Sequence, residues 1–137
     1  MKAAIKIMLL MPLVALMSCT PADEMLIGRW KQVCALERVL NEATGEAVID
    51  TLPGCDTQVL AFMEDATCLS ADRGDTVVYQ WSLSGSTLAL WREGWAEDYT
   101  VNQLTKQRLV YSDSYSYYDS ITGSRYIYKY RFEYKKL

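Results

Sequence analysis

The sequence predicts an all-β domain, an eight-stranded antiparallel up-and-down barrel. Between residues 125 and 134 an aromatic side chain stands at every second position, beginning at Tyr126. A period of two over ten residues is typical of a strand with one buried face. Residues 76–83 alternate in the same way. Six further runs, rich in aromatic and β-branched residues, follow at the close spacing of a sandwich or barrel; they are 26–36, 57–63, 66–71, 86–91, 95–101 and 107–117.

The connections between these runs differ at the two ends of the predicted barrel. Alternate connections of an up-and-down barrel lie at opposite ends, and here every second one is tight: 64–65, 84–85 and 102–105. The others are mostly longer and richer in Gly or charge: 37–56, 72–75, 92–94 and 118–124. The sequence therefore predicts one closed end and one mouth with a long flap, and a short helix over residues 35–41. Eight strands enclose room for side chains or one small ligand.

The N-terminus has the parts of a secretory signal peptide. Lys2 and Lys6 precede an apolar run over residues 7–17, which is shorter than the 20 or so residues of a membrane-spanning helix. Leu16-Met17-Ser18-Cys19 resembles the bacterial lipobox, whose cysteine is acylated after cleavage. We therefore expect a signal peptide at 1–18, a lipidated tether at 19–25 and a barrel domain at 26–137. The alternative is an ordinary signal peptide in which Cys19 is incidental.

These features predict an exported protein that its acylated Cys19 anchors in the bacterial cell envelope, most naturally in the outer membrane, with the leaflet left open. The mature chain keeps 12 basic against 17 acidic residues, a net charge of −5, which disfavours nucleic acid. The chain has no histidine, the commonest general base and metal ligand. We expect no enzyme activity, no cofactor and no metal; the acidic residues near position 97 lack calcium-loop spacing.

Three cysteines remain beyond Cys19, an odd number in a compartment that permits disulfides. Cys34 ends the first predicted strand and Cys55 precedes the second, so an antiparallel pair would bring them together at the mouth. A Cys34–Cys68 bond would have to cross the second strand. The sequence predicts Cys34–Cys55 with Cys68 free, and Cys55–Cys68 remains the competing pairing.

Three segments resemble the lipocalin-like family of exported lipoproteins in Gram-negative bacteria. They are Leu26-Ile27-Gly28-Arg29-Trp30, which is similar to the lipocalin Gly-x-Trp motif, and the stretches 79–88 and 99–110. The resemblance implies that Trp30 plugs the closed base of the barrel. It also implies that a basic residue of the last strand, Arg131 or Lys135, packs over the indole through a cation–π contact.

Eight of the ten tyrosines lie between Tyr111 and Tyr134. One interpretation is a last hairpin with a buried aromatic face. The other is a pocket at the mouth, because rings with hydroxyl tips suit an apolar site with a few polar anchors. Strand direction places these residues at the mouth: Tyr79, Trp95, Tyr99, Tyr115, Tyr117, Tyr126 and Tyr128.

The sequence supports two functional hypotheses for a monomeric, lipid-anchored domain. The first is a barrel that binds a small hydrophobic or amphipathic molecule. The second is a filled barrel that acts through its rim loops as an inhibitor or as an accessory to a membrane complex. Arg125, Lys129 and Arg131 share one strand face, which is either solvated or faces anionic lipid or a partner.

Overall fold

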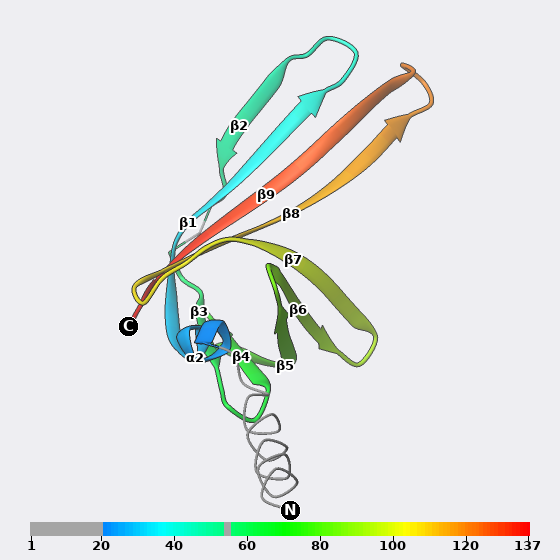
Figure 1. Ribbon diagram of the computed structural model, residues 1–137. Helices are drawn as coiled ribbons and strands as arrows, with labels where there is room; N and C mark the ends of the chain where they lie inside the picture. Colours follow the sequence, from blue (N-terminus) through cyan, green and yellow to red (C-terminus); the bar gives the residue numbers. More distant parts are fainter. Residues whose placement is uncertain (1–20, 54–55) are drawn as a thin grey trace, which may run out of the picture.

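The computed structural model describes residues 21–53 and 56–137 and shows one short helix and nine strands in this part of the chain (Figure 1). The helix α2 spans Pro21–Leu26, which covers most of the tether predicted at 19–25 and the first residue of the predicted barrel domain. The strands are β1 (Gly28–Asn41), β2 (Ala47–Thr51), β3 (Val59–Phe62), β4 (Thr67–Asp72), β5 (Asp75–Ser84), β6 (Thr87–Arg92), β7 (Trp95–Leu104), β8 (Arg108–Asp119) and β9 (Ser124–Lys136).

The strands form one antiparallel sheet that closes on itself. From β3 to β9 each strand pairs with the next along the chain, and β1 pairs with both β3 and β9. These eight strands make an up-and-down barrel, which confirms the predicted fold class. β2 is a ninth strand and pairs only with β1, outside the ring.

The predicted helix over residues 35–41 is wrong, because these residues continue β1. Leu36 pairs with Thr51 of β2 and with Arg131 of β9, and the pairing on both sides continues as far as Leu40. The predicted flap over 37–56 is likewise wrong in its first half, which is a hairpin. Leucine, glutamate and arginine favour helices only weakly, and strand pairing on two sides overrides that preference.

The barrel closes only near the end that carries α2 and the C-terminus, which we call the base. β1 pairs with β3 over residues 28–31 only, and β7 with β8 from Thr100 to Leu104 only. Beyond these points β2, β1, β9 and β8 continue as a four-stranded sheet, while β7 bends away from β8 (Figure 1). We call the sheet formed by residues 36–41, 47–51, 112–119 and 124–131 the projecting sheet.

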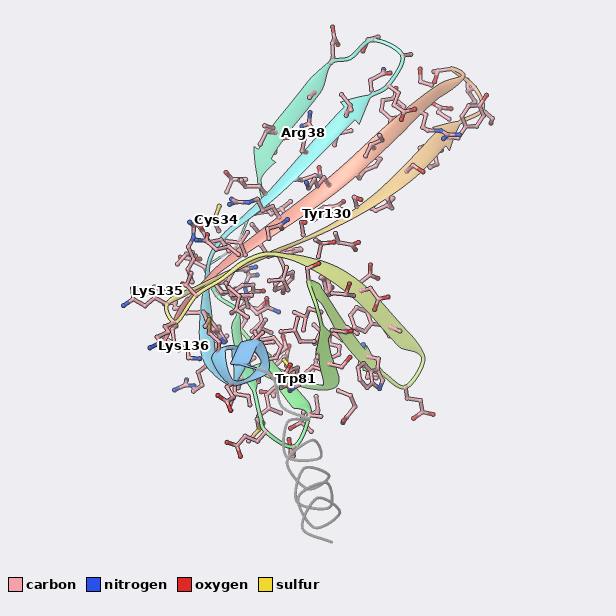
Figure 2. All side chains as sticks on the ribbon, viewed as in Figure 1. Cys34, Arg38, Trp81, Tyr130, Lys135 and Lys136 are labelled. Atoms are coloured by element: carbon pink, nitrogen blue, oxygen red, sulfur yellow. The ribbon has the colours of Figure 1, made fainter. Side chains whose placement is uncertain are left out.

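Trp30 closes the base, as the Gly-x-Trp resemblance implied. Its ring is fully buried, and its Nε1 donates a hydrogen bond of 2.8 Å to the carbonyl of Leu26 at the end of α2. The cation over the ring is Lys136, whose Nζ lies 4.5 Å from the ring centroid. The expectation of Arg131 or Lys135 is therefore wrong. Both alternate outward with the inward-facing Tyr134, and Figure 2 shows Lys135 pointing away from the barrel.

Gly28 is required by the same arrangement. Its φ is +131°, a conformation that side chains rarely adopt, and a Cβ atom there would lie 2.7 Å from Cε and Nζ of Lys136. The lysine then donates hydrogen bonds to the carbonyls of Met25 and Ile27. The absence of a side chain at Gly28 thus lets one cation bind both Trp30 and the last turn of α2.

The interior above Trp30 is filled by side chains. Phe62, Trp81, Leu109, Tyr111 and Tyr134 belong to one buried cluster. The Tyr134 hydroxyl lies 2.9 Å from that of Tyr111 and donates to Gln58, and Gln58 in turn donates to Ser70 at 2.8 Å. Among the described residues no buried side-chain nitrogen or oxygen lacks a partner. The closed part of the barrel is therefore a satisfied core.

The described cysteines lie on opposite sides of the barrel wall. Cys68 is buried in the core, and burial raises the pKa of its thiol to about 12. Cys34 pairs across the strands with Glu133 on β9, and neither Cys34 nor Cys68 forms a disulfide with another described residue. Cys55, the predicted partner of Cys34, lies outside the described residues, so this pairing stays a prediction. The chain on each side of it is hydrogen bonded to β1 beside Cys34, because Leu52 N–H donates to Ala35 and Gln32 N–H to Gln58.

Candidate binding surface at the mouth

The structure separates the seven tyrosines and tryptophans predicted to line the mouth into three groups. Tyr79, in the middle of β5, packs against Trp95, the first residue of β7, with ring centroids 5.1 Å apart. Tyr99 lies lower, 4.8 Å from the core ring of Tyr111. The other four, Tyr115, Tyr117, Tyr126 and Tyr128, lie on the projecting sheet. These residues therefore do not line a single cavity.

The face of the projecting sheet that continues the barrel interior carries a ladder of tyrosines. Tyr115 pairs with Tyr128, and their rings stack with centroids 5.0 Å apart and planes 7° from parallel. Tyr117 pairs with Tyr126 one step further out. Tyr115 and Tyr117 are 50% and 54% exposed, so no described element covers them. We call this side the inner face.

Tyr130 joins the ladder, although it was not among the predicted site residues. Its hydroxyl lies 3.3 Å from that of Tyr115. Hydrogen bonds to Tyr115 and to Glu37 raise its pKa above the ordinary value of a tyrosine. The alternation that identified Tyr126 and Tyr128 places Tyr130 on the same side, so the signal was present in the sequence.

Two carboxyl groups bridge the gap where β7 leaves β8. Glu97 of β7 hydrogen bonds to Asp113 of β8, and this contact, with some burial and the nearby charges, raises the pKa of Glu97 to about 7. Burial, together with the charges of these two groups, raises the pKa of Tyr99. The sequence did not predict a contact between Glu97 and Asp113, because no sequence signal shows where two strands separate.

The inner face therefore combines ring faces, hydroxyls and carboxylates. The strand registers place the following residues on it: Glu37, Val39, Asn41, Val48, Asp50, Asp113, Tyr115, Tyr117, Tyr126, Tyr128 and Tyr130. None of them is basic. Such a face offers π-systems and hydrogen-bond acceptors to whatever binds there, and it has an acidic character.

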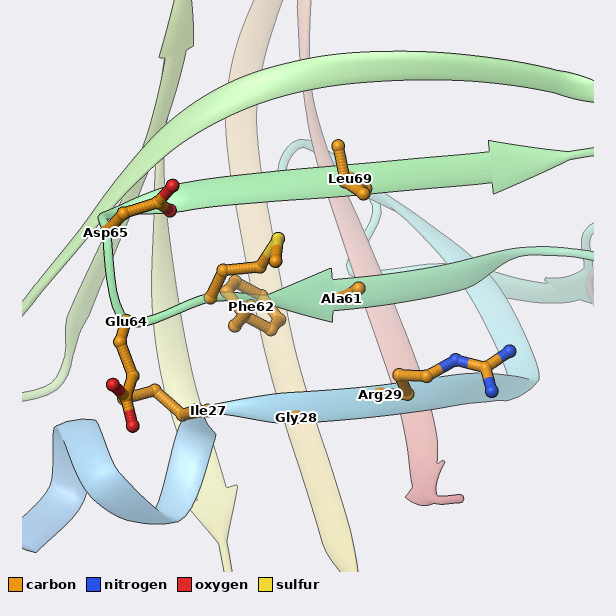
Figure 3. A pocket seen from close by; sticks show the side chains of 9 residues that line it. Ile27, Gly28, Arg29, Ala61, Phe62, Glu64, Asp65 and Leu69 are labelled. Atoms are coloured by element: carbon orange, nitrogen blue, oxygen red, sulfur yellow. The ribbon is translucent and has the colours of Figure 1, made fainter.

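A hollow lies on the outside of the barrel near its base. It measures about 710 Å³ and crosses the outer side of β1, β3 and β4, where Arg29, Ala61 and Leu69 stand on neighbouring strands (Figure 3). Ile27 and Glu64 lie at the end near α2. This hollow was not predicted from the sequence, because its shape depends on the register of three strands.

No protein-family model, no curated protein and no solved structure matches this chain. What is shown is the fold, an eight-stranded antiparallel barrel compatible with ligand binding. The resemblance to the lipocalin-like family remains one of fold and of the Gly28-Arg29-Trp30 motif. Within 21–53 and 56–137, no helix has the length and apolar character needed to cross a membrane. In the same part of the chain, no cluster of three metal-ligating side chains occurs.

Proposed function

We propose that this protein is a lipoprotein of the bacterial envelope that binds a partner protein through the inner face of its projecting sheet. The observation that carries the proposal is the uncovered tyrosine ladder around Tyr115 and Tyr128. Tyrosine is enriched at the centres of protein interfaces, because a rigid ring buries a large area at little cost in side-chain entropy.

The geometry favours this second hypothesis over a small ligand inside the barrel. Trp30, Trp81 and Tyr111 occupy the interior of the closed part. Small-molecule sites are concave and bury most of their ligand. The inner face is instead open along β8, which pairs with β9 but has no partner strand on its other side from Asp113 to Asp119. A broad, open and aromatic sheet face suits a macromolecule.

Tyr117 and Tyr118 provide a matched test of this surface. They are neighbours on β8 with similar exposure, 54% and 58%, but they point to opposite faces of the sheet. A photo-crosslinking amino acid is placed at 117, at 128 or at 118 of the full-length lipoprotein in its native host. We expect the same discrete protein adduct from 117 and 128 and none from 118.

A further variant ties the adduct to the tyrosine ladder. Tyr115→Ser removes the ring that stacks on position 128 and should abolish the adduct formed at 117. Equal adducts from 117 and 118, or none from the inner face, would overturn the proposal. A small molecule that co-purifies with the protein, without any protein adduct, would support the first hypothesis instead.

The anchor is tested separately, since Cys19 lies outside the described residues. Cys19→Ala should move the protein from the membrane to a soluble exported fraction. Fractionation of cells that express the variant and the wild type, with membranes washed in high salt, shows whether this occurs, and membrane association that survives the salt wash unchanged would contradict acylation at Cys19.

A further inference from the structure

The outer face of the projecting sheet carries a cluster of cations. Arg38 of β1 pairs directly with Lys129 of β9, and Arg131 and Arg125 stand on the same side of β9. Figure 2 labels Arg38 on β1 and Tyr130 on β9, which belong to the two opposite faces of this sheet. Because side chains alternate along a strand, all four cations point away from the tyrosine ladder.

These cations form no ion pair with another described residue, although Asp98 and Asp113 line a hollow beside Lys129. Directly opposed like charges on neighbouring strands repel each other. In the described part of the chain the recorded ion pairs are Arg73–Asp72 and Arg108–Glu133, and neither includes Arg38, Lys129 or Arg131. The mature chain has a net charge of −5, so this concentration of positive charge is a local feature of one face.

Aliphatic side chains lie among the cations. Leu36 and Ile49, with the cations Arg38, Lys129 and Arg131, line a shallow groove of about 220 Å³. Ile49 is 63% exposed. Leu40 pairs with Ile127 on the same face, one step further out. An exposed face that mixes cations with aliphatic groups suits the interface of an anionic membrane, where both kinds of side chain find partners.

We propose that the outer face of the projecting sheet docks onto the anionic headgroups of the membrane that carries the anchor. The length of the chain favours a membrane as the occupant. α2 begins at residue 21, two residues after Cys19, and two residues span at most about 7 Å. An anchor at Cys19 would therefore hold the base of the domain close to the bilayer, and the cationic face lies further along β1, the strand that follows α2.

Docking of the outer face onto the membrane would add to the proposed function, and this inference rests partly on that function. The barrel would lie along the membrane with its outer face down, and the tyrosine ladder on the opposite face would point away from the lipid. A partner protein would then approach the inner face without obstruction from the bilayer.

The test uses the mature protein without its lipid, as Cys19→Ala, so that binding depends on the protein surface alone. Sedimentation is measured with vesicles of phosphatidylcholine, with and without 30% phosphatidylglycerol. The probe variant is Lys129→Gln/Arg131→Gln. The control is Arg73→Gln/Lys106→Gln, which removes the same charge from exposed sites elsewhere.

We expect binding only to the anionic vesicles, with an affinity that falls as salt rises. Each cation near an anionic surface changes the affinity about fivefold, so the probe variant should bind about 25-fold more weakly. The control should bind within about twofold of the parent. Circular dichroism and the thermal midpoint check that both variants fold.

Three outcomes would overturn the proposal: equal binding to both kinds of vesicle, no binding to either, or equal losses in the probe and control variants. An acidic protein as the true occupant of this face would give the second of these. The proposed function can fail independently, because its crosslinks form on the inner face. The adduct at position 117 should persist in Lys129→Gln/Arg131→Gln.

Discussion

Replacement of Trp30 tests the closure of the barrel most directly. The side chain is fully buried, donates a hydrogen bond to Leu26 and lies under the Lys136 ammonium. Truncation of a buried tryptophan to alanine costs about 3–5 kcal/mol in free energy of unfolding. About 1 kcal/mol of this belongs to the hydrogen bond and ~0.5–1 kcal/mol to the cation–π contact. The remainder is lost packing.

Trp30→Phe separates these contributions. Phenylalanine keeps most of the packing but cannot donate to Leu26, whose carbonyl then loses its side-chain partner. We expect a loss of about 1.5–2 kcal/mol for Trp30→Phe, against about 3–5 kcal/mol for Trp30→Ala. Urea unfolding of the unlipidated mature protein measures both, and each kcal/mol should lower the thermal midpoint by about 4 °C in a domain of this size.

Trp91 provides the control, because it is 39% exposed on β6 and belongs to no buried cluster. Trp91→Ala should cost less than about 1 kcal/mol. If Trp30→Ala costs no more than Trp91→Ala, then the base cluster does not hold the barrel closed. If Trp30→Phe is as damaging as Trp30→Ala, the hydrogen bond to α2 outweighs the packing.

Three further predictions concern the base, the gap and the cysteines. Gly28→Ala should lower the thermal midpoint, and Lys136→Ala should restore only part of the loss, because it relieves the clash but not the positive φ. Folding raises the pKa of Glu97 from its ordinary 4.5 to about 7, so the native state keeps a proton that the unfolded chain releases, and stability should fall as the pH rises through this range. Glu97→Gln should flatten that slope in urea midpoints measured at several pH values. Non-reducing peptide mapping of the exported protein should link Cys34 to Cys55, and a linked peptide containing Cys68 would refute this assignment.

The fold was largely predictable, because period-two alternation survives in single sequences wherever one face of a strand is buried. All eight predicted strands occur in the barrel. β2 was missed because all five of its residues are exposed, so burial imposes no alternation on them. The helix predicted over residues 35–41 followed local propensity, which pairing with β9 and β2 overrides.

The candidate site was predictable only as a set of side chains on one strand face. Alternation correctly placed Tyr115, Tyr117, Tyr126 and Tyr128 together. It did not show that β7 leaves β8 beyond Thr100, which turns the expected cup into an open sheet. The register of β9 against β1 was also hidden, because it shifts at an irregularity between Gln32 and Cys34. Lys136 pairs directly with Trp30, whereas Arg131 pairs with Leu36 further along β1 and faces outward.

The projecting sheet and the closed barrel differ in how their side chains are packed. Every member of the buried cluster lies in the closed part, and no residue of the projecting sheet belongs to it. Side chains on the projecting sheet are therefore free of the packing constraints that hold the base together. Yet their charges are sorted, with the carboxylates and most of the tyrosines on one face and the cations on the other. Core packing does not account for such sorting. Two different surroundings would account for it, the proposed partner on the inner face and the proposed anionic membrane on the outer one.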